Sequence, residues 1–167
     1  MISFRWQGSL DRTELAEVEE LLTAAVPYDA EAGFSTAEPR AEGDDQTRHL
    51  LVRMAPRGER GSSDLDRLPD VSVVAYLRLD MDDGQGALQF VVHPEFRSLG
   101  VGTLLFERLR DESGWAEVSG LTSVHTWAHG AHPAADRMAK RLGASVTDAW
   151  FKTLRFLGGA EPFIAAE

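Results

Sequence analysis

Residues 87–105 read ALQFVVHPEFRSLGVGTLL, and this stretch decides the fold. Its first part is rich in β-branched and aromatic residues, and it stops at Pro94, which has no N–H for a further ladder bond. Gly100 and Gly102 permit backbone conformations and close approaches that a Cβ would obstruct. Apolar residues recur at helical spacing from Val101 onward. The stretch therefore predicts a strand, a tight glycine-containing turn and a helix in direct succession.

A turn of this kind is suited to binding an anion. It directs the unpaired N–H groups of the first helical turn outward, at the positive end of the helix dipole. A P-loop needs a lysine directly after its second glycine, and the dinucleotide fingerprint needs a third glycine; the sequence has neither. Two interpretations remain at this point. The turn binds a phosphate group of another ligand, or it is an ordinary connection whose glycines allow tight packing.

The spacing Arg97-x-x-Gly100-x-Gly102, preceded by a Val-x-Pro strand end at Val92 and Pro94, resembles motif A of the GNAT acyltransferase superfamily. The resemblance implies that backbone amides of the turn hold the pyrophosphate of acetyl-CoA. It also implies that the end of the preceding strand leaves its neighbour, pairs with the pantetheine arm and polarises the thioester carbonyl through its N–H groups. The cosubstrate-binding residues implied are Phe90, Val91, Val92, Arg97, Ser98, Leu99, Gly100, Val101, Gly102, Thr103 and His132, the last at the start of the final helix.

A second segment resembles one family within that superfamily. The sequence Trp-Ala-His-Gly at residues 127–130, followed by Pro-Ala-Ala from Pro133 and Arg-Leu-Gly from Arg141, is similar to mycothiol synthases of actinobacteria. That family is built of two tandem GNAT domains, whereas 167 residues have room for one. We therefore expect a single GNAT domain over residues 1–167, with residues 158–167 as a loose tail.

The expected fold is α/β (α+β), with the order of elements of the GNAT fold. It has a central mixed, mostly antiparallel sheet of about six or seven strands, splayed between the fourth and fifth and flanked by about four helices. The Asp-Gly pair at Asp83 predicts the hairpin before the fourth strand. Strands are expected at residues 2–6, 49–54, 71–79, 87–92, 121–127 and 146–157. Helices are expected from the cap at Asp11 to before Pro27, in a short piece at 36–40, at 103–113, and from Pro133 to the glycine cap at Gly143.

Composition narrows the range of partners. The hydrophobic content of 43% is typical of a globular protein, and the absence of cysteine excludes disulfides, thiolate catalysis and cysteine-based metal sites. We predict no metal. There is no apolar signal segment and no run long enough to span a membrane, so a cytoplasmic location is the expectation. The net charge of −10 argues against nucleic acid and anionic membranes, and it favours a cationic partner such as an amine.

The acceptor side of the reaction is poorly marked. Many GNAT relatives carry a proton-donating tyrosine four residues before the glycine of the final helix, and Ala139 occupies that position here. His129, at the end of the fifth strand, is the predicted catalytic residue by the intrinsic pKa of its side chain. The alternative for His129 is a loop histidine that stabilises its turn through hydrogen bonds.

Three functions therefore stay open. The first is an acetyl-CoA-dependent N-acetyltransferase acting on the primary amine of a small molecule. The second is a catalytically weak or inactive CoA-binding GNAT module that serves as a sensor or structural partner. The third is an unrelated α/β binding domain. We also predict a homodimer, because only 24 residues follow Gly143 and a second subunit would complete the acceptor site.

Overall fold

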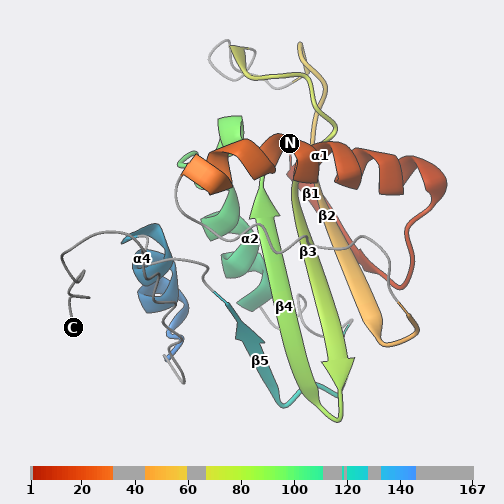
Figure 1. Cartoon of the computed structure of the whole chain (residues 1–167), viewed down its shortest axis with the longest axis vertical. Helices are drawn as coiled ribbons and strands as arrows, with labels where there is room; N and C mark the ends of the chain where they lie inside the picture. Colours follow the sequence, from red (N-terminus) through yellow and green to blue (C-terminus); the bar gives the residue numbers. More distant parts are fainter. Residues whose placement is uncertain are drawn as a thin grey trace, which may run out of the picture.

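The computed structural model describes residues 2–31, 44–59, 67–110, 118, 120–127 and 133–145 (Figure 1). The strands within these residues form one mixed sheet in the order β1-β2-β3-β4-β5, antiparallel as far as β4 and parallel between β4 and β5. This confirms the predicted mixed, mostly antiparallel sheet. The described elements are β1 Ile2–Gln7, α1 Arg12–Glu31, β2 Thr47–Met54, β3 Val73–Asp82, β4 Gln85–Val92, the 3-10 helix η2 Pro94–Phe96, α2 Val101–Arg110, β5 Ser123–Thr126 and α4 Pro133–Leu142.

The splay predicted between the fourth and fifth strands is present. β5 pairs with β4 from Gln85 opposite Ser123 to Leu88 opposite Thr126, and the pairing ends there in the described part of the chain. The last four residues of β4 are paired with β3 but not with β5. The two strands diverge from this point, as Figure 1 shows. Three other predicted segments, at 36–40, 146–157 and 158–167, lie outside the described residues.

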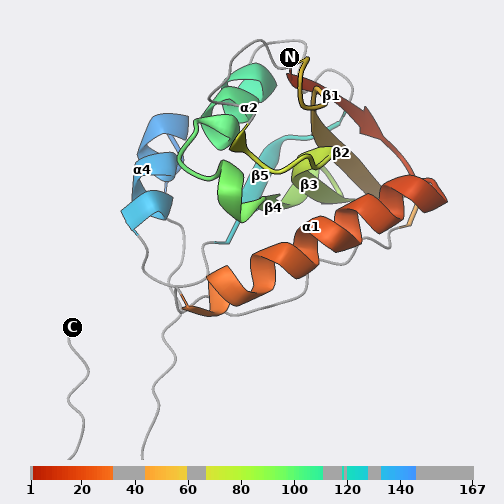
Figure 2. The ribbon, with the colours of Figure 1, turned by 90° about the horizontal axis from the view of Figure 1, so that it is seen from above.

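The sheet separates two layers of helices. α1 crosses one face, whereas α2 covers the other, with α4 beside α2 (Figure 2). The larger apolar core lies between the sheet and α2, and its members include Leu50, Leu77 and Leu105. The smaller core lies under α1, where Leu21 packs with Tyr76 and other residues of the central strands. None of the helices in the described residues has the length and apolarity that a membrane crossing requires.

Helix α1 begins as predicted and ends later than predicted. Asp11 accepts hydrogen bonds from the amides of Thr13 at 2.8 Å and Glu14 at 2.9 Å, and Glu14 accepts one from the Asp11 amide at 3.0 Å. This is the capping box that the sequence indicates. The prediction that the helix ends before Pro27 is wrong, because the helix extends beyond this exposed proline.

Contacts made by the last turn of α1 explain why the helix continues. A proline inside a helix removes one backbone hydrogen bond, so side-chain contacts beyond it gain weight. The Tyr28 hydroxyl donates to Glu95 Oε1 at 3.3 Å, and Asp29 Oδ1 lies 2.8 Å from Arg97 Nη1. Both contacts attach the end of α1 to the segment that follows β4.

Local turn chemistry sets the remaining connections near the site. Asp83 and Gly84 have φ values of 42° and 78° and form the predicted two-residue hairpin between β3 and β4. Pro94 ends β4 and starts η2. Gly143, with φ 66°, ends α4 in the left-handed conformation expected of a helix cap.

Candidate functional site

The turn between β4 and α2 has two residues in the left-handed region. Ser98 has φ 63° and Gly100 has φ 83°. A Cβ on Gly100 would meet nothing within 4 Å, so glycine is favoured there by the backbone conformation and not by lack of space. Residues 98–100 are exposed. The turn is therefore held in a special conformation at the surface, where a ligand has access to its backbone.

The first turn of α2 leaves amide groups available. The first amide that donates within the helix is that of Leu104, to the Gly100 carbonyl at 2.9 Å. The three preceding amides, at Val101, Gly102 and Thr103, have no acceptor within an α-helix. They lie at the positive end of the helix dipole, next to the exposed turn, and this arrangement suits a phosphate or diphosphate.

Gly102 has a role different from that of Gly100. A Cβ there would lie 3.1 Å from Phe90 Cζ and 3.1 Å from Met138 Cε, closer than ordinary side-chain contacts. Phe90 also packs edge-on against Phe106 of α2, with ring centroids 5.2 Å apart. The glycine thus lets the start of α2 approach both β4 and α4. The packing interpretation therefore applies to Gly102, whereas at Gly100 glycine is favoured by the backbone conformation of the exposed turn.

The edge of β4 that β5 leaves unpaired is called here the open edge. Of the predicted residues Phe90, Val91 and Val92, two direct their backbone groups to it. The His93 amide donates to the Val74 carbonyl of β3 at 2.9 Å. Because backbone groups alternate along a strand, the N–H and C=O of Val91 also face β3, and those of Phe90 and Val92 face the edge that β5 has left. The side chain of Val91 is buried under α1.

The Arg97 side chain is directed back along this open edge. Its Nε donates to the Val92 carbonyl at 3.0 Å, and its Nη1 forms the ion pair with Asp29. The guanidinium therefore binds the Val92 carbonyl, which is the last one of the open edge, and links this edge to α1 through Asp29. Sequence reasoning placed Arg97 at the turn but gave no indication of this partner on α1.

The α1 face of the sheet changes from apolar to polar along the strands. Under α1 the row across β2, β3 and β4 consists of Leu51, Tyr76 and Val91. Two residues further along each strand, side chains on the same face are polar. We call this set the polar floor: Gln7, His49, Arg78 and Gln89 in one row, and Thr47 and Asp80 in the next.

The polar floor is internally hydrogen-bonded. Arg78 Nε and Nη2 donate to the Asp80 carboxylate at 2.9–3.0 Å, and the Thr47 hydroxyl donates to Asp80 Oδ1 at 2.9 Å. The Tyr76 hydroxyl and His49 Nδ1 share a hydrogen bond of 2.7 Å. Burial raises the pKa of Tyr76, whereas burial and then the Arg78 charge lower the pKa of His49. Both causes favour the neutral form of the His49 imidazole.

Sequence reasoning missed this cluster. The expected third strand ended at residue 79, and the structure corrects this, since Asp80 lies within β3 and forms an ion pair with Arg78. The available signal was the alternation of polar residues at Thr47 and His49 with Arg78 and Asp80 in two neighbouring strands. Their relation depends on the pairing register, which a sequence does not state.

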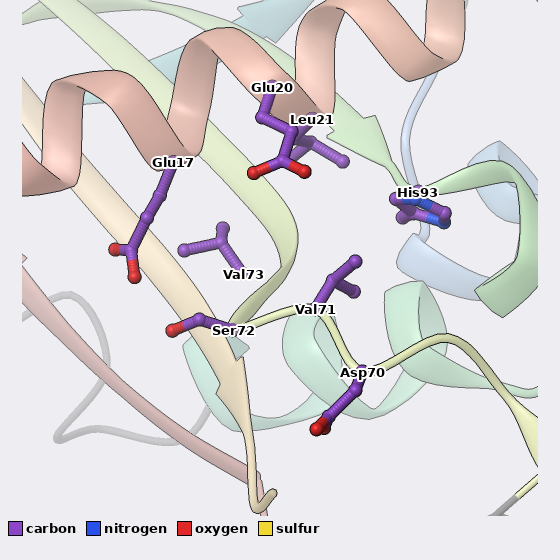
Figure 3. Close-up of a pocket in the computed structure, with 8 residues that line it drawn as sticks. All are labelled: Glu17, Glu20, Leu21, Asp70, Val71, Ser72, Val73 and His93. Atoms are coloured by element: carbon purple, nitrogen blue, oxygen red, sulfur yellow. The ribbon is translucent and has the colours of Figure 1, made fainter.

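A pocket of about 240 Å³ lies on the same face of the sheet, between the middle of α1 and the start of β3 (Figure 3). No residue of the polar floor lines it. Glu17 of this pocket is bound to Arg53 at 2.7 Å. His93 borders it, and burial lowers the pKa of this histidine. His93 Nδ1 is buried without a hydrogen-bond partner among the described residues. The lining residues are Glu17, Glu20, Leu21, Asp70, Val71, Ser72, Val73 and His93.

The predicted catalytic histidine is not placed. His129 and His132 lie outside the described residues. Ala139, at the position of the family's tyrosine, is half-buried in α4. The two tyrosines of the chain are engaged elsewhere, Tyr28 with Glu95 and Tyr76 with His49.

Comparison with known proteins identifies the family. Residues 16–144 match the model of the acetyltransferase (GNAT) family. This chain belongs to that family. The match includes the open edge of β4, the turn and α4, so the resemblance drawn from motif A is confirmed.

Curated relatives of this GNAT chain are named mycothiol acetyltransferase. The one from Mycobacterium avium is 34% identical over 147 residues, which cover 87% of this chain and 42% of the relative. That from Mycobacterium sp. strain JLS is 29% identical, covering all of this chain and 50% of the relative. The chain thus spans about half the length, or less, of these relatives.

Solved structures show the same fold at low identity. An aminoglycoside N-acetyltransferase, AAC(6')-Iy, in complex with CoA superimposes with a TM-score of 0.55 at 14% identity. The alignment covers 92% of this chain and 99% of that one. At this identity the likeness supports the GNAT fold and carries no assignment of substrate.

Proposed function

We propose that this chain is an N-acetyltransferase that transfers the acetyl group of acetyl-CoA to the primary amine of a small molecule. The observation that carries the proposal is the continuity of the open β4 edge with the amide-lined turn. Phe90 and Val92 direct backbone groups to that edge, and the free amides at the start of α2 follow directly after it. This spatial order of backbone groups fits a ligand in which a long arm joins a thioester to a diphosphate.

The proposed reaction uses backbone groups on the donor side. The amine nitrogen attacks the thioester carbonyl carbon, and the oxygen gains negative charge that an N–H of the β4 edge would stabilise. The C–S bond then breaks, the CoA thiolate takes up a proton, and the nitrogen loses one. A thiolate is a good leaving group, so the absence of a tyrosine at Ala139 is compatible with turnover.

The polar floor is the proposed acceptor surface. It lies next to β4 on the face opposite α2, and Gln89 of β4 belongs to it. It offers the Arg78–Asp80 ion pair, amide groups and a neutral imidazole within two rows of the sheet. Such a mixture of donors and acceptors suits a small polar amine.

The alternative function is a CoA-binding module without catalysis. The observation in its favour is Ala139 at the position where many GNAT relatives carry a proton-donating tyrosine. This alternative predicts CoA binding that is unaffected by changes in the polar floor, and no acetyl transfer.

Isothermal titration with acetyl-CoA tests the binding half of the proposal. We expect saturable binding by the unaltered chain and its loss in Gly100→Glu, which places a negative side chain at the diphosphate site. Gly120→Glu is the matched control, because Gly120 also has positive φ and open space, and it lies near Gly84 at the other end of β4. No binding by the unaltered chain, or equal loss in both variants, would contradict the site.

Release of free CoA in the presence of a panel of small amines tests the transfer half. We expect amine-dependent release above the rate of hydrolysis with at least one amine. Binding without release across the panel would favour the module.

A further inference from the structure

The charge around the turn is unfavourable for a ligand with a diphosphate. Within residues 93–104 the charged side chains are Glu95 and Arg97, and Asp29 of α1 lies against Arg97. This segment and its ion-pair partner thus carry two carboxylates and one guanidinium, in a chain whose net charge is −10. The turn amides and the helix dipole supply the positive potential that remains.

The ion pair between Arg97 and Asp29 keeps the single cation of this segment occupied. Nη1 of Arg97 lies 2.8 Å from Asp29 Oδ1, while Nε is bound to the Val92 carbonyl. The two side chains are 33% and 29% exposed, so solvent and ions reach the pair. An incoming anion at the turn is therefore in a position to compete with Asp29 for the same guanidinium.

We propose that Asp29 is an affinity-determining residue of the donor site, which restrains Arg97 and weakens binding of the anionic cosubstrate. This inference rests on the proposed function, since it takes the turn as the diphosphate site. When the cosubstrate binds, Arg97 Nε keeps its hydrogen bond to the Val92 carbonyl at the β4 edge. The outer nitrogens of the guanidinium turn from Asp29 to the phosphate oxygens. Because Asp29 lies in the last turn of α1, occupancy of the donor site is linked to the end of that helix.

The exposure of the pair sets the size of the effect. Exposed ion pairs are weak and screened by salt, so Asp29 restrains the guanidinium without preventing its release. Removal of one unit charge near a bound anion at water-like dielectric corresponds to a change of a few fold in affinity. We expect Asp29→Asn to lower the Kd of CoA by about threefold at low salt, with the gain shrinking as salt increases.

Titrations of CoA into the full chain and four variants test this inference. The variants are Asp29→Asn, Arg97→Gln, the double variant and Asp82→Asn. Asp82 is the charge-matched control, because it is exposed at the hairpin, at the far end of β4 from the turn. We expect tighter binding in Asp29→Asn, weaker binding in Arg97→Gln, no change in Asp82→Asn, and most of the Asp29→Asn gain lost when Arg97 is also replaced. Thermal melts of each variant establish that it is folded.

The outcomes separate this inference from the proposed function. Equal or weaker binding by Asp29→Asn overturns the inference and leaves CoA binding intact. An undiminished gain in the Arg97→Gln background overturns it too, because Asp29 would then act by direct repulsion and not through the guanidinium. Absence of CoA binding by the unaltered chain overturns both.

Discussion

The two faces of the sheet are built from adjacent residues of the same strands, yet they differ in chemistry. The row facing α2 consists of Trp6, Leu50, Leu77 and Phe90. The residue that follows or precedes each of these along its strand belongs to the row Gln7, His49, Arg78 and Gln89 of the polar floor. A sheet that is covered by helices on both faces needs apolar side chains on both, and here the face under α1 is apolar only in part. The polar floor lies beyond both apolar cores and is therefore a candidate for function.

Neighbouring residues on β3 give the sharpest test of this difference. Leu77 is fully buried against the α2 core, and Leu77→Ala is expected to lower the free energy of unfolding by about 2–5 kcal/mol. Arg78→Ala is expected to lower it by less, because the Arg78–Asp80 ion pair is partly open to solvent, with 14% and 37% of the two side chains exposed. Urea unfolding followed by circular dichroism measures both. Equal losses would show that the polar floor is structural.

The second test concerns the boundary between the apolar and polar halves of the α1 face. Tyr76 belongs to the apolar row, and its hydroxyl binds His49 in the polar floor. Tyr76→Phe leaves His49 Nδ1 without this partner in a buried position, at a cost of about 1–3 kcal/mol. The double variant with His49→Leu should recover part of this loss in the same unfolding measurement. A harmless Tyr76→Phe would mean that water replaces the hydroxyl.

The part of the fold set by local chemistry follows from the sequence. The cap at Asp11, the hairpin at Asp83, the strand end at Pro94 and the helix end at Gly143 each depend on a residue and its near neighbours. Helix α1 passes Pro27 because contacts from distant residues outweigh a local preference. The order of the elements could therefore be predicted, and this helix boundary could not.

The candidate site likewise has one part that local sequence indicates and another part that depends on contacts between distant segments. The turn and the end of β4 are contiguous in sequence, so their spacing was sufficient to indicate an anion site. The partnership of Arg97 with Asp29 and the rows of the polar floor join segments far apart in the chain, and their geometry depends on strand register and helix placement. The predicted catalytic residue His129 and the predicted cosubstrate-binding residue His132 lie outside the described residues and stay predictions.

The third test addresses the turn on the α2 side. Gly100 has positive φ and open space around it, so Gly100→Ala is expected to cost about 1 kcal/mol through backbone strain alone. Gly100→Asn should cost less, because asparagine tolerates the left-handed region better. Unfolding measurements on the two variants compare them at one position. Equal costs would point to a lost contact of the turn and not to its conformation.

The smallest expected effect is a pH dependence confined to the α1 face. His49 and Thr47 are the buried polar residues among those described, and His49 alone of the two titrates. Burial, followed by the Arg78 charge, lowers the pKa of His49, and burial also lowers the pKa of His93 beside the pocket. The unfolded chain therefore binds more protons than the folded chain below about pH 6.5. The free energy of unfolding should be constant near neutral pH and should decrease as the pH falls through and below 6.5. Urea unfolding at several pH values, with His49→Gln and His93→Gln for comparison, measures each contribution; a slope unchanged in both variants would place the titrating groups elsewhere.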